Sequence, residues 1–387
     1  MQSINHSLEQ LISYIDRSQY RGYDPYDAMN SPLIKAFPGK WPKILSTQIL
    51  KRLPLNIRPV IGIKKSVNPK MLGLCLQAWC IMYEKYGEQS YKNRADDCFN
   101  RLMNNYSKGY HGMCWGYNFP WISPVKYLPA YSPTSVVTAF VVKGLYAYYR
   151  VFNSKKALEA ILSASRFIMN DLHISRFEEG LCFSYSTLKP ELCYNASLLA
   201  AEVLFYAWAE NGGSKYFDVA KKAVDFVINK QHTDGHWNYS MDLQTNVERC
   251  QVDFHQGFIL NSLARIIELS AFSEEKYLTA LKKGLAFYRE KQFTGEGRAL
   301  WRLPHNWPAD IHHQAQGIIT FASMGHYQEG IEAFARIIAE WTIANMQDAG
   351  GYFYYKKSGL FINKISYLRW GQAWMLLALS KIAQKTT

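Results

Sequence analysis

ASLLAAEVLFYAWA (196–209) and KYFDVAKKAVDFVINKQ (215–231) follow each other in the chain, and this pair decides the fold. The first segment is apolar nearly all round, which is typical of a helix that is buried on every side. The second places apolar residues three or four positions apart, as at Ala220, Val224 and Val227, which predicts a helix with one exposed face. The pair therefore predicts an inner, buried helix followed by an outer, half-exposed one.

The same alternation recurs weakly about every sixty residues, which is typical of a helical repeat. The predicted pairs cover 68–87 with 91–108, 133–152 with 154–172, 191–210 with 214–231, 252–270 with 274–291, and 309–324 with 327–346. A last helix over 367–384 has no partner after it, and a helix near 6–18 would supply one. Six hairpins then close into a ring. The sequence predicts an all-α fold, an (α/α)6 toroid, with inner helices beginning near 68, 133, 194, 252, 310 and 367.

Residues 20–66 lie outside the repeat and are rich in proline and aromatic residues. Tyr, Trp, Leu and Ile are too frequent there for a linker, so we expect a short irregular extension that packs on the toroid; the alternative is a flexible arm. The expected organisation is one domain, with the N-terminal helix and extension in 1–66 and the toroid in 67–387. The segment YDPYD (23–27) is either a cap over the mouth of the toroid or a simple turn.

The formal net charge is +13, which favours polyanionic partners. An acidic or lipid-linked glycan fits that charge, as does peripheral contact with an anionic membrane; solvated surface charge is the alternative. No nucleic-acid motif occurs, so we expect no nucleic-acid partner. No apolar run reaches the 18 residues that would indicate a membrane-spanning helix, and the start of the chain does not resemble a signal peptide. The seven cysteines contain no CxxC pair, which favours reduced thiols and a cytoplasmic location.

The long loops and the starts of the inner helices meet at one mouth in a toroid of helical hairpins. Aromatic side chains there pack on the C–H faces of sugars, and polar groups bind hydroxyls. The predicted substrate-binding residues are Trp115, Tyr117, Tyr185, Asn195, Trp237, Trp301, His313, Tyr352, Tyr354, Arg369 and Trp370. The alternatives are aromatic side chains that only pack between hairpins and, for Arg369, a salt bridge between helices.

Two inner helices begin with the same Asp-x-His pattern, in QVDFHQGF (251–258) and ADIHHQAQG (309–317). We therefore predict that Asp253, His255, Asp310 and His312 are the catalytic acids and bases, because histidine exchanges protons near neutral pH. The alternative interpretation is that each Asp is only a helix N-cap and that each His is a hydrogen-bonded side chain of the core. The spacing of these residues with Cys250 and His313 matches no structural zinc site, so no metal and no cofactor are predicted.

KQHTDGHW (230–237) resembles the QxxDGxW repeat of the squalene-cyclase and prenyltransferase toroids, and NMQDAGGYFYY (345–355) is a looser copy. This resemblance implies the toroid and adds an isoprenoid-binding protein as an alternative function. The acidic DxDD motif of the cyclases is absent, and DIHH (310–313) stands nearest to it.

Over nearly its whole length the chain resembles a poorly characterised family from bacterial surface-polysaccharide gene clusters. The segments that carry this likeness are GYDPYDAMNSP (22–32), LPLNIRPVIGI (53–63), NPKMLGL (68–74), CYNASLLAA (193–201), DFHQGF (253–258), DIHHQAQGIITF (310–321), NMQDAGGYFYY (345–355) and LRWGQAWM (368–375). Members are often labelled delta-aminolevulinic acid dehydratase, a β/α-barrel enzyme, but this sequence does not alternate strands with helices.

The family's fold resembles six-hairpin glycosidases, uronyl hydrolases and sugar epimerases. The resemblance implies a carbohydrate-active enzyme of hydrolase, lyase or epimerase type in surface-polysaccharide biosynthesis. A non-catalytic glycan-binding or assembly protein is the alternative.

Overall fold

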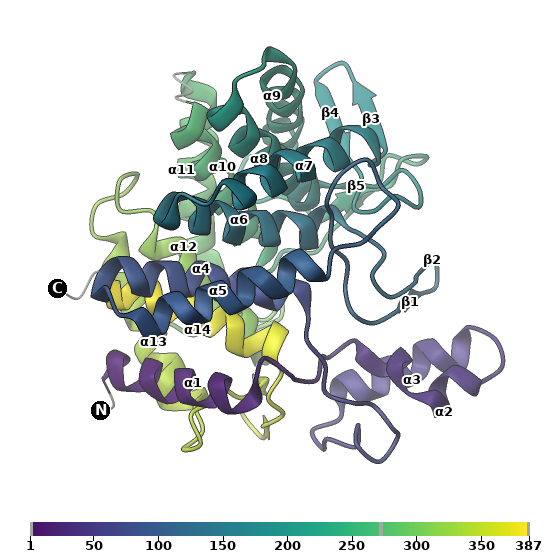
Figure 1. Cartoon of the computed structure of the whole chain (residues 1–387), viewed down its shortest axis with the longest axis vertical. Coiled ribbons are helices and arrows are strands. Elements are labelled where there is room, and N and C mark those ends of the chain that lie inside the picture. The colour runs from purple at the N-terminus through teal and green to yellow at the C-terminus, as the bar shows by residue number, and fades with distance from the viewer. Residues whose placement is uncertain (1–2, 271–273, 385–387) are drawn as a thin grey trace.

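The computed structural model describes residues 3–270 and 274–384 (Figure 1). Within them, six helices form a closed inner ring in which each helix contacts the next and the last contacts the first. They are α4 (Pro69–Tyr86), α6 (Ser135–Phe152), α8 (Tyr194–Asn211), α10 (His255–Ser270), α12 (Ile311–Ala322) and α14 (Ala373–Gln384). A single π-helical turn, Leu368–Gln372, leads into α14. The predicted starts of the inner helices are confirmed to within a few residues.

The outer ring packs against the inner one and includes the N-terminal helix. Its members are α5 (Gln89–Asn104), α7 (Lys155–Asn170), α9 (Ser214–Asn229), α11 (Glu275–Lys291), α13 (Ile331–Met346) and α1 (Ile4–Ser18). Helix α1 contacts α13 and α14, so it supplies the outer partner that the last inner helix lacks in sequence order. The prediction of an all-α toroid closed by its N-terminal helix is confirmed.

Short antiparallel strands fasten the loops that lead back to the inner helices. They are β1 (Trp121–Ser123), β2 (Lys126–Leu128), β3 (Ile174–Phe177), β4 (Gly180–Phe183), β5 (Leu192–Cys193), β6 (Ser240–Met241), β7 (Glu248–Arg249), β8 (Ala309–Asp310), β9 (Lys356–Lys357) and β10 (Ile362–Asn363). In the described part of the chain, the largest sheets are the three-stranded β5-β6-β7 and β8-β9-β10. Figure 1 shows β1 to β5 at the same end of the molecule as α2 and α3. The inner helices begin at this end, which we call the mouth.

The loop between α9 and α10 shows how neighbouring hairpins are joined. The Gln231 side chain donates to the carbonyl oxygens of Gly235 (2.8 Å) and of Ala280 on α11 (2.9 Å). The Trp237 indole is fully buried and donates to the Val227 carbonyl at 2.8 Å. The QxxDGxW motif therefore fixes the loop to its own outer helix and to the next one.

The looser copy of the motif closes the ring. The Gln347 side chain donates to the carbonyl oxygens of Gly351 (3.3 Å) and of Ser7 on α1 (3.1 Å). Gly351 lies against the Gln10 backbone, where a side chain would collide. Helix α1 therefore takes the place that the following outer helix occupies in the other repeats.

The extension between α1 and α4 folds at the mouth end (Figure 1). It contains a 3₁₀ turn, Asp27–Asn30, and helices α2 (Pro32–Ala36) and α3 (Trp41–Arg52). Ala28, Met29, Ile34, Leu50 and Ile63 form a small apolar core of its own. The Arg58 guanidinium, also fully buried, pairs with Asp27 at 2.8 Å and fixes the turn.

Three predicted substrate-binding residues are packed between the two rings of helices. Trp115 and Trp237 are fully buried, and the Trp115 indole donates to the Leu102 carbonyl at 3.0 Å. His313 is buried between the rings of Tyr288 and Phe293, with ring centroids 5.8 Å and 5.2 Å away. These three side chains offer no surface to a ligand.

In the described residues, no helix has both the length and the hydropathy that are needed to cross a membrane.

Replacing Gly235 by alanine should strongly destabilise the toroid. Its φ of +103° is unfavourable for other residues, and an added Cβ would lie closer than 3.0 Å to the Lys283 carbonyl oxygen. We expect a loss of about 2–4 kcal/mol in the free energy of unfolding, measured by chemical denaturation. Gly295→Ala is the matched control, because nothing lies within 4 Å of its Cβ position. Equal stability of the two variants would contradict this account.

The buried His313 should make the fold sensitive to acid. Burial lowers the pKa of His313 from 6.5 to about 4. Between these two pH values, His313 is protonated in the unfolded state but stays neutral in the folded state. Above about pH 6.5 the ring is neutral in both states and does not lower the stability. As the pH falls toward 4, protonation of the unfolded state lowers the free energy of unfolding by about 3 kcal/mol. The free energy of unfolding of the wild type should fall more steeply between pH 7 and 4 than that of His313→Leu. The exposed His326→Gln variant should follow the wild type, and parallel curves for all three proteins would refute the assignment.

Candidate functional site

The start of α10 holds a carboxylate and an imidazole in direct contact. Asp253 Oδ1 lies 2.5 Å from His255 Nδ1 and also accepts from the His255 backbone N–H at 3.2 Å. Asp253 Oδ2 accepts from the Gln251 amide at 2.8 Å and lies 3.7 Å from Arg302 Nε. Burial alone would raise the pKa of Asp253, but His255 and the hydrogen bonds lower it to about 2. The carboxylate is therefore ionised and held by its partners.

This contact sets the protonation of the imidazole. An ionised carboxylate can only accept, so His255 Nδ1 carries a proton and donates it to Asp253. Nε2 is left to exchange protons, which is the arrangement of an oriented general base. The His255 ring packs against Tyr239 and Phe254, and 16% of its side chain is exposed at the mouth. We refer to Asp253 and His255 as the dyad.

Asp310 starts α12 with the same local pattern but has different neighbours. Its Oδ1 accepts from the His312 backbone N–H (2.9 Å) and from the Trp370 indole (2.8 Å). Its Oδ2 lies 3.6 Å from Lys356 Nζ. Burial raises the pKa of Asp310, although Lys356 and the hydrogen bonds oppose this. Burial also lowers the pKa of Lys356 to about 8, and its ammonium lies 3.9 Å from the centroid of the Trp301 ring.

His312 faces the aromatic interior of the toroid. Its ring centroid lies 4.3 Å from that of Phe254, and His255 stacks on the same phenyl ring at 4.2 Å. Phe254 therefore contacts both imidazole rings. Neither ring nitrogen of His312 has a hydrogen-bond partner in the described residues. Burial and the nearby Lys70 ammonium hold the pKa of His312 well below its usual value, so the ring is neutral.

The four predicted catalytic side chains are therefore not one facing set. Asp253 and His255 form the dyad, whereas Asp310 caps α12 and binds Trp370. The His312 ring packs on Phe254 and bonds to none of the other three side chains. Asp310 is also the N-terminal cap of α12, where it accepts the His312 backbone N–H. Asp253 accepts the backbone N–H of His255, the first residue of α10.

The extension brings a phenol and an amine to the same place. Lys51 Nζ on α3 lies 2.5 Å from the Tyr26 hydroxyl, and the Tyr26 ring packs on Trp370 with centroids 5.6 Å apart. Burial lowers the pKa of Lys51 to about 8, and the Asp310 carboxylate acts in the opposite direction. Tyr26 belongs to YDPYD, the segment that we interpreted from the sequence as either a cap over the mouth or a turn. No sequence pattern indicated Lys51.

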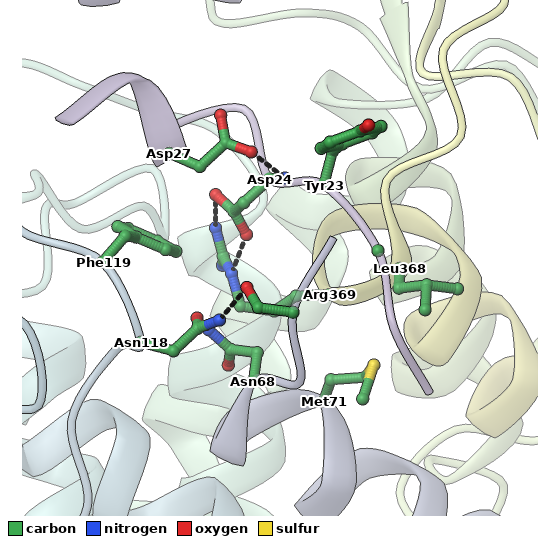
Figure 2. Close-up of a pocket in the computed structure, with 11 residues that line it drawn as sticks. Tyr23, Asp24, Asp27, Asn68, Met71, Asn118, Phe119, Leu368 and Arg369 are labelled. Carbon is green, nitrogen blue, oxygen red and sulfur yellow. Dashed lines mark hydrogen bonds and ion pairs between the residues drawn. The ribbon is translucent and has the colours of Figure 1, made fainter. Parts of the chain in front are cut away.

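Arg369 forms an ion pair with the N-terminal extension. Its guanidinium binds Asp24 through two hydrogen bonds of 2.5 and 2.7 Å, and both side chains are buried (Figure 2). The adjoining cavity, about 10 Å³, has room for no more than a water molecule. Arg369 therefore fixes the extension over the mouth, and its bidentate geometry is not available to a substrate carboxylate.

The remaining predicted residues lie in two places. Tyr117 and Tyr185 are half-buried beside the mouth, with hydroxyls 3.4 Å apart, and the buried Asn195 accepts from the Cys193 thiol. Tyr352, in contrast, packs on Tyr14 of α1. Tyr354 donates to Asp348 at 3.0 Å in the same loop. The structure does not bring Tyr352 and Tyr354 to the dyad.

Sequence reasoning missed Lys70, although a signal was present. Asn68 caps the Lys70 backbone N–H at 3.0 Å, the same two-residue offset as in the two Asp-x-His patterns. The Lys70 ammonium lies over the rings of Phe140 (4.2 Å), Phe258 and Trp374 (both 5.2 Å), and burial holds its pKa well below the usual range. Searching for any cap followed by a titratable side chain would have found it.

No cluster of three or more His, Cys, Asp or Glu side chains suited to a metal ion occurs among the residues that the structure describes.

Several solved structures share this architecture. The GH76 α-mannanase from Bacteroides thetaiotaomicron matches at 14% identity and a TM-score of 0.66, covering 98% of this chain and 96% of that chain. A cellobiose 2-epimerase from Bacillus thermoamylovorans matches at 13% identity and 0.64, covering 82% and 88%. An unsaturated glucuronyl hydrolase specific for heparin matches at 13% identity and 0.63, covering 98% and 96%. No family model matches the sequence, and no curated protein does. The likeness establishes the fold, a closed (α/α)6 toroid.

Proposed function

We propose that this protein is a carbohydrate-active enzyme that performs acid–base chemistry at the mouth of the toroid. The observation that carries this proposal is the dyad, in which Asp253 fixes the proton on His255 Nδ1 and leaves Nε2 for catalysis. The reaction is of hydrolase, lyase or epimerase type, since each needs a base that removes a proton from water, from a hydroxyl or from a sugar carbon.

The groups around the dyad suit a second proton transfer and a sugar ring. Lys356, with a pKa of about 8, exchanges a proton near neutral pH and lies 3.6 Å from Asp310. Trp301, which is half-buried, offers aromatic surface for the C–H face of a pyranose. The buried Trp370 supports this region through its contacts with Tyr26 and Asp310. In this scheme His255 is the base, Lys356 is the acid, and Asp310 positions Lys356.

Two further considerations support a glycan substrate. The similar structures named above are an α-mannanase, a cellobiose 2-epimerase and an unsaturated glucuronyl hydrolase, so this fold supports sugar chemistry in other proteins. Lys51, Lys356 and Arg302 also gather positive charge at the mouth, which favours an acidic glycan.

The setting and the domain organisation are parts of the same proposal. Surface-polysaccharide assembly in the cytoplasm, on a lipid-linked glycan with peripheral membrane contact, is the setting that we propose from the sequence resemblance and the +13 charge. We propose that residues 1–66 and 67–387 act as one domain, because Tyr26 and Lys51 complete the mouth.

Replacing Asp253 by asparagine should lower turnover about 10²–10⁴-fold, because the amide oxygen can still accept the His255 backbone N–H but no longer fixes the proton of the His255 ring. The assay uses cellobiose, manno-oligosaccharides, saturated 1,4-linked uronic-acid oligosaccharides and unsaturated glucuronyl disaccharides in deuterated water. New reducing ends indicate hydrolysis, deuterium on a sugar carbon indicates epimerisation, and a conjugated uronate indicates elimination. Melting temperature is recorded on the same samples.

Asp234→Asn is the matched control. Asp234 Oδ1 lies 2.6 Å from His236 Nδ1 in the same Asp-x-His geometry, but in an exposed turn of the α9–α10 loop. This variant should keep full turnover. Undiminished turnover of folded Asp253→Asn would refute the catalytic assignment, and glycan binding without turnover in the wild type would favour the non-catalytic alternative.

A further inference from the structure

A cavity of about 390 Å³ opens inside the toroid at the end opposite the mouth. Its lining extends to the C-terminal turns of the inner helices, with Glu84, Arg150 and Glu268 among its residues, whereas the dyad and Asp310 lie at the helix starts. Each inner helix contributes to the lining, for example through Gln77, Lys143, Glu202, Asn261, Gln316 and Lys381. The cavity therefore belongs to the ring itself and is distinct from the candidate site.

Three aromatic rings lie between this cavity and the mouth. Phe140, Phe258 and Trp374 contact one another with centroids 5.0 to 5.4 Å apart, and all three line the cavity. Lys70 and His312, which belong to the first turns of their helices, pack on the same rings. The rings therefore form a wall across the axis of the toroid.

The wall of the cavity carries a buried charge pair. Lys143 Nζ lies 2.6 Å from Glu202 Oε2, with 13% and 1% of their side chains exposed, and the Tyr206 hydroxyl donates to Glu202 Oε1 at 2.8 Å. Burying two charges costs several kcal/mol, which their attraction repays only in part, so such a pair is weak evidence for a stabilising role. Facing a cavity, the pair is suited to binding the hydroxyls of a ligand.

Aromatic and amide groups complete the lining. The rings of Tyr146 and Tyr206 lie 4.3 Å apart, and the Arg265 guanidinium lies over both, at 5.4 and 5.6 Å. The Asn261 oxygen accepts from Gln316 at 2.8 Å, which orients its amide. These are the aromatic faces and fixed polar groups that a sugar ring requires.

The balance of charge selects the class of ligand. The charged residues that line the cavity are Lys143, Arg150, Arg265 and Lys381, with Glu84, Glu202 and Glu268. Cations and carboxylates nearly cancel, which disfavours a polyanion, in contrast to the positive mouth. We propose that this cavity is a second carbohydrate site, which takes an uncharged mono- or disaccharide; ligand pockets of about 300–1,000 Å³ are typical for small molecules.

The test combines crystal soaking with calorimetry. The probes are glucose, mannose, cellobiose, maltose and mannobiose, with glucuronate as the charged comparison. We expect a neutral sugar beside the hydrogen-bonded Glu202 and Tyr206 side chains in the soaked crystal. The affinity should fall at least about tenfold in Glu202→Gln, because a charge-assisted hydrogen bond is lost. Glucuronate should bind this cavity more weakly than the neutral sugars.

A second variant keeps the proposal testable if Glu202→Gln does not fold. Ala147 is half-buried and lines the cavity, so Ala147→Trp should fill it and abolish this binding without removing a charge. Asp253→Asn should leave the affinity of the cavity unchanged, which separates this site from the dyad. The proposal is overturned if no neutral sugar binds, if sugar occupies only the mouth, or if folded Ala147→Trp binds as the wild type does.

Discussion

The toroid depends on one repeated contact, in which a loop glycine touches the backbone of the next outer helix. It occurs at Gly112, Gly180, Gly235, Gly297 and Gly351, where a Cβ would lie closer than 3.0 Å to a carbonyl oxygen of that helix. No side chain fits at that distance, so the contact sets how near two hairpins stand. The last of these glycines meets α1, and the same spacing therefore closes the ring.

This spacing determines where the inner helices begin and so builds the mouth, but it does not determine the chemistry of each start. Asp253 and Asp310 each accept the backbone N–H two residues further on at the start of neighbouring inner helices, yet the pKa of Asp253 is lowered and that of Asp310 is raised. The difference comes from the neighbours. The His255 imidazole and the Gln251 amide stabilise the charged form of Asp253. Asp310 has only the Trp370 indole and the more distant Lys356 ammonium beside its own helix N–H, so burial dominates its pKa.

The two ends of the chain depend on each other. The last inner helix is covered by α1, and the turn before it holds the extension through the buried pair of Arg369 and Asp24. The extension in turn places Tyr26 and Lys51 over the starts of α12 and α14. The N-terminal segment therefore closes the ring and also completes the mouth.

The sequence by itself determined the ring, the order of its helices and the two caps with their histidines, because apolar periodicity and capping are local properties. The tertiary structure decided the rest. Trp115 and Trp301 both follow an outer helix, but the first is fully buried and the second lies under Lys356, since exposure depends on which distant helix packs there. His255 and His312 share a pattern, yet of these two imidazole rings only that of His255 contacts a carboxylate. The cavity opposite the mouth is lined by residues from all six inner helices, so no local stretch of sequence could predict it.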